Sequence, residues 1–211
     1  MNSALKAGLA ACTALLAGCA PAMQNAAIGR TDAAPGRLSI AQPASTVGAN
    51  GLTLSSPQFV DGGTLPLEQV GNSNGCTGMN LSPELDWSGV PAGTLSLVLT
   101  TYDPDAPTGS GLWHWVNYNI PASATSLPKG AGTPGGTALP AGTLVLNNDP
   151  GVAGYSGACP PVGDAPHRYV FTLYALNKTL TVPDGTRPPL LGFNLNGSVL
   201  AKTSISATYG R

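Results

Sequence analysis

Most of the side chains that could do chemistry lie in two short segments of this sequence. The first is residues 103–119, DPDAPTGSGLWHWVNYN, which contains Asp103, Asp105 and His114. The second is residues 154–169, GYSGACPPVGDAPHRY, which contains His167, the other of the chain's two histidines. Both segments are dense in glycine and proline, which places their histidines beside turns. We therefore expect the two segments to meet and to form one polar pocket.

Neither a metal site nor a nucleophilic enzyme is favoured by these residues. The sequence has no HxxxH or HExxH spacing of metal ligands and no GxSxG motif. No sequence pattern activates Ser110 or Ser156, and Cys159 could serve as a nucleophile beside His167 only as a free thiol. We predict no metal, no cofactor and no catalytic residue. The alternative is a hydrolase that uses the His/Asp cluster on a phosphorylated or acylated substrate.

Recognition of an anion fits the two segments better. A glycine-rich turn such as residues 154–163 is expected to expose backbone N–H groups to an anion. Histidines add N–H donors that become positively charged as the pH falls through 6–7, and Tyr169 adds a hydroxyl. A carboxylate would accept from an ammonium or hydroxyl group of the ligand. At least one of Asp103 and Asp105 is expected to be structural, either by capping the turn or by pairing with Arg168.

Three strands would position these residues. Residues 95–102 are apolar enough for a strand buried on both faces, and this strand leads directly into Asp103. Residues 112–120 alternate, which predicts Trp113 and Trp115 on one face and His114 on the other, with Leu112 and Val116. In residues 167–176 the same rule places His167 and Tyr169 on one face and Arg168 on the opposite face.

The remaining pattern predicts a mainly β domain of about eight strands. Only 9% of the residues are charged, while there are 28 glycines and 20 prolines, a composition that favours an all-β domain over a disordered chain. A helix is expected over residues 189–201, where leucine and valine recur at every fourth position. Further strands are expected at residues 52–56, 65–68, 143–147 and 202–209, and at the end of 75–87.

The N-terminus is typical of an exported protein. Residues 1–18 have one lysine before a short apolar run, as in a signal peptide, and Leu-Ala-Gly-Cys resembles a bacterial lipobox. Cys19 would then be acylated, although an ordinary signal with a chance cysteine is the alternative. Residues 19–50 read as a flexible tether and residues 51–211 as the domain. We expect a lipoprotein at the periplasmic face of a membrane, with the outer membrane preferred because Ala20 is not aspartate.

Two further sequence features bear on covalent structure and partners. Cys76 and Cys159 remain beyond the anchor in an exported chain, which favours a disulfide over two free thiols. A net charge of −1 gives no basic footprint, so a nucleic-acid partner is not expected. No apolar run approaches the roughly 20 residues of a membrane-spanning helix.

The motifs of this chain resemble those of the phosphatidylethanolamine-binding protein family, in its bacterial Raf-kinase-inhibitor-like branch. The resemblance runs from about residue 52 to residue 209. It rests on DPDAPTGSGLWHWV, GYSGACPPVGDAPHRY, FTLYAL, NLSPELDW and the Asn-Ile-Pro at residues 119–121. Two departures are Ala158, where many relatives have proline, and residues 108–111, which lack a tyrosine found in animal relatives.

The resemblance implies a large central antiparallel sheet, a smaller sheet, and one or two short helices, the last near the C-terminus. It also implies a small cavity for phosphate-type anions or phospholipid headgroups, without catalysis. By motif, the ligand-binding residues would be Asp103, Asp105, Pro107, His114, Gly157, His167 and Tyr169. An inhibitor or protein-interaction module is a further possibility. The kinase-inhibitor label describes cytoplasmic signalling and is not transferred to an exported chain.

Overall fold

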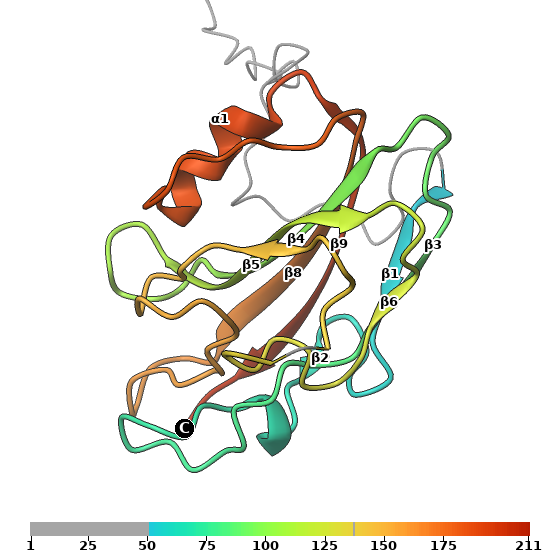
Figure 1. Ribbon diagram of the computed structural model, residues 1–211. Coiled ribbons are helices and arrows are strands. Elements are labelled where there is room, and N and C mark those ends of the chain that lie inside the picture. Colours follow the sequence, from blue (N-terminus) through green and yellow to red (C-terminus); the bar gives the residue numbers. More distant parts are fainter. Residues whose placement is uncertain (1–50, 137) are drawn as a thin grey trace, which may run out of the picture. The chain divides into compact units, whose positions relative to one another are not determined.

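The strand β4 (Ser96–Asp103) lies at the centre of the fold, and each of its eight residues is buried. A computed structural model of the chain describes residues 51–136 and 138–211. In it, β4 pairs antiparallel with β5 on one side and with β8 on the other (Figure 1). The prediction of a strand at residues 95–102 that is buried on both faces is confirmed.

The described residues form two sheets. The larger sheet has six strands in the order β2 (Gly63–Thr64), β9 (Val199–Tyr209), β8 (His167–Leu176), β4, β5 (Leu112–Pro121) and β7 (Leu144–Val145). All its pairs are antiparallel except β2 with β9. The smaller sheet has three strands in the order β1 (Thr53–Ser55), β3 (Leu85–Ser88) and β6 (Ser126–Leu127). The predicted mainly β fold with a large and a small sheet is confirmed.

A hydrophobic core covers each face of the larger sheet. One core contains side chains of both sheets, such as Trp87 of β3 and Phe171 of β8. The other contains Tyr174 of β8 and is closed by Leu191 and Leu195 of the helix α1 (Leu191–Leu195). Figure 1 shows α1 and the smaller sheet on opposite sides of the larger sheet. Burial of the central strands on both faces follows from this arrangement.

Two predicted elements differ in the structure. Residues 65–68 are not a strand; instead a 3-10 turn, η2 (Leu67–Gln69), begins after Pro66, whose carbonyl accepts the Gln69 N–H. The helix predicted over residues 189–201 is a short 3-10 turn, η3 (Pro188–Leu190), followed by five-residue α1. Gly197 has φ 70°, a left-handed conformation typical of a helix C-terminus, and the chain then enters β9.

The strand β5 departs from simple alternation because it has a β-bulge at His114. Consecutive residues of β4 lie opposite Trp115 and Trp113, so His114 is the extra residue. Trp113 and Val116 therefore pack into one core and Trp115 into the other. The prediction that the two tryptophans share a face is wrong for this reason. The bulge leaves His114 in contact with Tyr169, on the face of the larger sheet that meets the smaller one.

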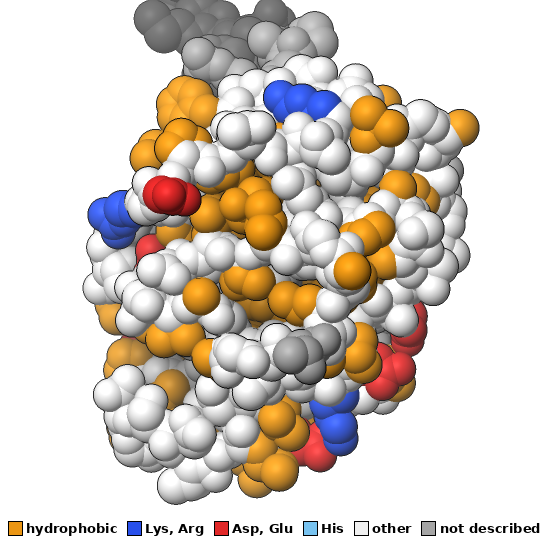
Figure 2. All heavy atoms as spheres, in the orientation of Figure 1, with side chains coloured by type: hydrophobic (Ala, Val, Ile, Leu, Met, Phe, Trp, Pro, Cys, Tyr) orange, Lys and Arg blue, Asp and Glu red, His pale blue; other side chains and the backbone are white. Residues whose placement is uncertain are grey.

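The surface of the described residues carries few charges. The face in Figure 2 consists mainly of uncharged polar and hydrophobic side chains, with small, separate groups of charged side chains. Within residues 51–136 and 138–211, no helix is long and apolar enough to cross a bilayer. The predicted signal peptide, lipidation site and tether, residues 1–50, lie outside the described residues.

Candidate functional site

Asp103, the last residue of β4, contacts His167. Its Oδ1 accepts the N–H groups of Asp105 and Ala106, at 2.8 and 3.0 Å, and so caps the turn that follows β4. Its Oδ2 accepts from Nδ1 of His167 at 2.8 Å. The Asp103 side chain is 3% exposed. The carboxylate therefore fixes both the turn and the orientation of the His167 ring.

His167 lies between two carboxylates at the start of β8. Its Nε2 is 3.4 Å from Oδ2 of Asp164, so both ring nitrogens face an acceptor. Burial by itself lowers the pKa of His167, but the hydrogen bond and the negative charge of Asp103, with help from Asp164, outweigh burial and raise it. The arrangement favours the protonated imidazolium.

Asp105 is the member of the aspartate pair that binds an arginine. It accepts from Arg168 in a bidentate geometry, with Nε–Oδ2 at 2.8 Å and Nη2–Oδ1 at 2.7 Å. The Arg168 hydrogen bond holds the pKa of Asp105 below its usual range, against the opposing effect of burial. The expected pairing of one aspartate with Arg168 is confirmed. Pro107, in the same turn, is exposed.

His114 contributes a buried nitrogen that has no partner. Its Nδ1 lies 2.7 Å from the carbonyl oxygen of Ser156, so Nδ1 carries the proton. Nε2, an acceptor in the neutral ring, makes no hydrogen bond in the structure. Burial is the main cause that lowers the pKa of His114, which favours the neutral ring.

Tyr169 meets His114 edge-on from β8. The ring centroids are 5.2 Å apart at an interplanar angle of 77°. Tyr169 is 1% exposed, and its O–H donates no hydrogen bond in the structure, while the backbone of Cys159 lies close to its oxygen. Burial, with the charge of Asp103, raises the pKa of the hydroxyl, so it stays a neutral donor. The predicted placement of Tyr169 and His167 on one face of β8 is confirmed.

The glycine-rich turn does not offer its N–H groups in the way that the sequence predicts. The N–H groups of residues 154–158 all donate to backbone or side-chain oxygens of the protein. Among them, Gly157 N–H donates to Oδ1 of Asn80 at 2.7 Å. The prediction of free N–H groups is wrong for these residues, because oxygens of Gln69, Asn80, His114, Gly132 and Val152 accept them. Gly157 is required sterically, since a Cβ there would lie 2.5 Å from the backbone nitrogen of Gly71.

Two hollows flank these residues. A cavity of about 330 Å³ is lined by His114, Gly157 and residues of the segment 71–80. A wider hollow of about 630 Å³ is lined by Asp105, His167 and their neighbours in the segment 163–168. Asp103, Pro107 and Tyr169 are absent from both linings. The structure thus brings His114, Tyr169, His167 and Asp103 together, whereas Asp105 and Pro107 lie at the exposed side.

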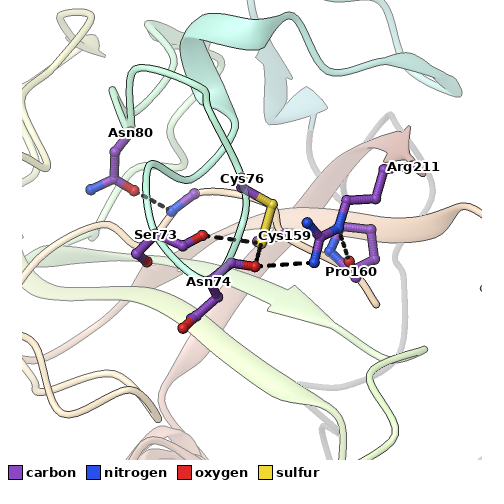
Figure 3. Close-up of a disulfide and its surroundings, with 8 residues drawn as sticks. Ser73, Asn74, Cys76, Asn80, Cys159, Pro160 and Arg211 are labelled. Atoms are coloured by element: carbon purple, nitrogen blue, oxygen red, sulfur yellow. Dashed lines mark hydrogen bonds between the residues drawn. A yellow bond between two sulfur atoms is a disulfide. The ribbon is translucent and has the colours of Figure 1, made fainter. Parts of the chain in front are cut away.

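A disulfide joins two segments of the cavity wall that lie far apart in the sequence. Cys76 and Cys159 are bonded, with their Cα atoms 5.9 Å apart, so the predicted disulfide is present (Figure 3). Cys159 also lines the 330 Å³ cavity. Among the described residues, no group of three or more His, Cys, Asp or Glu side chains could hold a metal ion.

Sequence reasoning missed a positioning residue, Asn148. It is 3% exposed, and its Nδ2 donates to the carbonyls of His114 and Gly154 and to Oγ of Ser156, at 2.8–3.1 Å. Asn148 therefore ties the bulge of β5 to the turn that holds the His114 ring. Nothing in its local sequence, Asn-Asn-Asp-Pro, distinguishes it from an ordinary turn asparagine.

Comparison with known proteins places this geometry in a family. Residues 55–210 match the family model described as phosphatidylethanolamine-binding protein. YbhB of Escherichia coli is 47% identical over 159 residues, which cover 75% of this chain and 99% of YbhB. Escherichia coli YbcL is 46% identical over 157 residues, 74% of this chain and 86% of YbcL. LppC of Mycobacterium tuberculosis, whose name describes a lipoprotein, is 39% identical over 65% of this chain and 61% of its own length.

A solved structure supports the same assignment. The crystal structure of Escherichia coli YbcL, described as a member of the mammalian PEBP family, aligns with a TM-score of 0.73 at 45% identity. The alignment covers 76% of this chain and 98% of the YbcL chain. The chain therefore belongs to the phosphatidylethanolamine-binding protein family.

Proposed function

We propose that this protein is a non-catalytic binding protein that holds a small phosphate-type anion, free or as a phospholipid headgroup, at His114 and Tyr169. One observation carries the proposal. Two buried polar atoms in contacting rings, His114 Nε2 and the Tyr169 hydroxyl, have no partner in the structure. A buried polar group without a hydrogen bond costs about 1–3 kcal/mol, so such a pair is expected where a ligand supplies the partner.

The charges around the two atoms fit an anion that carries a proton. The Tyr169 hydroxyl can donate to a phosphate oxygen, while neutral His114 Nε2 can accept from a P–OH group. A phosphate monoester has its second pKa near 6, so about half of the molecules retain such a proton at pH 6 and about a tenth at pH 7. The imidazolium of His167, held by Asp103, adds positive charge nearby. A ligand without a donor would instead require protonation of His114.

Two features support binding without catalysis. The cysteine of the second motif, Cys159, is in a disulfide and has no thiolate to act as a nucleophile. His167, the natural general base, has each ring nitrogen facing a carboxylate. His114 does have a free Nε2, but no serine, threonine or cysteine side chain among the described residues donates to it, whereas a hydrolase needs a nucleophile held against its base.

The proposal includes a cellular location. The signal-like residues 1–18 and the Leu-Ala-Gly-Cys sequence support export and lipid attachment at Cys19. The relation to LppC, named a lipoprotein, supports the same location. We place the domain at the periplasmic face of a membrane, with the outer membrane preferred.

A pair of tyrosine variants tests the binding site. Tyr169→Phe removes one unpartnered hydroxyl from the site, and Tyr174→Phe removes another from the opposite face of β8. Neither hydroxyl makes a hydrogen bond in the structure. The denaturant midpoint of unfolding of each variant is therefore expected to equal that of the wild type or to lie slightly above it. Calorimetric titration of the unreduced full-length chain with inorganic phosphate should show at least about 10-fold weaker binding for Tyr169→Phe alone, as expected for a hydrogen bond to a charged group. Equal affinity of both variants and wild type would contradict the proposal.

A further inference from the structure

The segment 71–80, which we name the cysteine loop, is fastened to the turn that carries Gly157. The Cys76–Cys159 disulfide joins them, and Asn80 Oδ1 accepts the Gly157 N–H at 2.7 Å. Arg211 adds a third link by donating to the carbonyls of Pro160 and Asn74, at 2.6 and 3.2 Å. Figure 3 shows these contacts on both sides of the disulfide. The loop is thereby held as a fixed wall of the His114 cavity.

This wall is polar and uncharged. Of the fourteen residues that line the cavity, five come from the cysteine loop, and four of these are Asn72, Ser73, Asn74 and Asn80. The lining contains no Asp, Glu, Lys or Arg residue. Its amide and hydroxyl groups can both donate and accept hydrogen bonds, which suits ligand hydroxyl groups.

The nearby carboxylates are already paired, which disfavours an ammonium group in this cavity. Asp103 and Asp164 face His167, and Asp105 is bound to Arg168. Asp149, which also acts on His114, accepts the Trp113 N–H and lies 3.8 Å from Arg187. An ammonium in the cavity would lose hydration without a free carboxylate to replace it. A hydroxyl group, in contrast, can donate to and accept from the amide and hydroxyl side chains of the cysteine loop that line the same cavity.

We propose that the cysteine loop makes this site selective for polyol phosphates, whose hydroxyl-bearing part lies against the loop amides. The inference rests on the anion site proposed above and specifies which phosphates it prefers. A cavity of about 330 Å³ lies at the lower end of the roughly 300–1,000 Å³ range of small-molecule sites, so it has room for more than a bare phosphate.

Three soluble probes test the preference by calorimetry on the unreduced full-length chain. They are sn-glycerol 3-phosphate, phosphoethanolamine and inorganic phosphate. We expect glycerol phosphate to bind at least about 5-fold more tightly than either of the others. Dihexanoyl phosphatidylglycerol, below its micellar concentration, then identifies the source of the chemistry. If this lipid binds as tightly as sn-glycerol 3-phosphate, the ligand is a lipid headgroup. If it binds much more weakly, the ligand is a free phosphate monoester. Both results agree with the inference.

A negative charge placed on the loop should reduce the preference for glycerol phosphate over phosphoethanolamine. Asn72 is an exposed residue of the cavity wall, so Asn72→Asp puts a carboxylate there without removing a buried group. We expect it to weaken glycerol phosphate binding at least about 3-fold and to raise the relative affinity for phosphoethanolamine. Asn177→Asp is the matched control, because Asn177 is exposed, follows the far end of β8 and is outside the cavity lining. It should leave the ratio of affinities unchanged.

The outcomes separate the two proposals. If all the phosphates bind with equal strength, or phosphoethanolamine binds most tightly, the polyol preference is overturned while the anion site stands. The preference is also overturned if Asn72→Asp and Asn177→Asp change the ratio alike. If no probe binds, inorganic phosphate included, the proposed anion site itself fails.

Discussion

Replacing Asp103 with asparagine should weaken the fold by an amount that depends on pH. The amide keeps an oxygen to accept the two turn N–H groups but removes the negative charge that faces His167 Nδ1 at 2.8 Å. A hydrogen bond between charged groups contributes about 1.5–3 kcal/mol, and a neutral one about 1 kcal/mol. We expect Asp103→Asn to lower the free energy of unfolding by about 1.5–3 kcal/mol where His167 is protonated.

The pH range over which Asp103 stabilises the fold follows from the direction in which the pKa of His167 is shifted. The pKa of His167 is raised in the folded state, so its stabilising contribution is complete below the ordinary value near 6.5 and is lost as pH rises through the raised value. The penalty of Asp103→Asn should therefore be about 1.5–3 kcal/mol at pH 6 and fall to about 1 kcal/mol at pH 9.

Urea unfolding of the unreduced protein at the two pH values measures this difference. Asp61→Asn is a suitable control, because Asp61 Oδ1 also accepts a backbone N–H, from Ser206 at 2.7 Å, and faces no histidine in the structure. Its penalty should be the same at pH 6 and pH 9. An Asp103→Asn penalty that is equally independent of pH would refute the idea that Asp103 holds His167 in the charged form.

Three further variants test other parts of the structure. The double change Cys76→Ser and Cys159→Ser opens a loop with a sequence separation of 83 residues; the chain-entropy relation gives a loss of about 4.5 kcal/mol, measurable by urea unfolding, and a loss below about 1 kcal/mol would contradict it. Gly157→Ala should cost about 1–3 kcal/mol in the same assay because its Cβ would overlap the backbone of Gly71, and wild-type stability would show that the contact relaxes freely. His114→Asn, which keeps a donor for the Ser156 carbonyl but removes Nε2, should weaken phosphate binding about 10-fold or more by calorimetry; unchanged affinity would exclude Nε2 as a ligand contact.

The sequence predicts elements well where local pattern decides them. β4 is a continuous apolar run, and β8 alternates without interruption along the stretch that carries His167 and Tyr169, so their shared face follows from the period of a strand. The disulfide follows from the two cysteines that remain beyond the predicted signal segment. These predictions depend only on neighbouring residues or on composition.

The errors arise where distant segments decide the structure. The bulge at His114 exists only in the pairing with β4, so the residues of β5 alone do not reveal it. The N–H of Gly157 is occupied by Asn80, which is 77 positions away in the sequence. The cysteine loop enters the site for the same reason, because a disulfide and a side-chain hydrogen bond bring it there.

The most direct test of the account is to follow the imidazole NMR signals of both histidines while inorganic phosphate is added near pH 6.5. The account predicts that free His114 is neutral with its proton on Nδ1, and that sub-millimolar phosphate shifts the His114 and His167 signals together with one dissociation constant. If neither signal moves at several millimolar phosphate, or if His114 already carries a proton on Nε2 in the free protein, then the pair of unpartnered atoms is not an anion site.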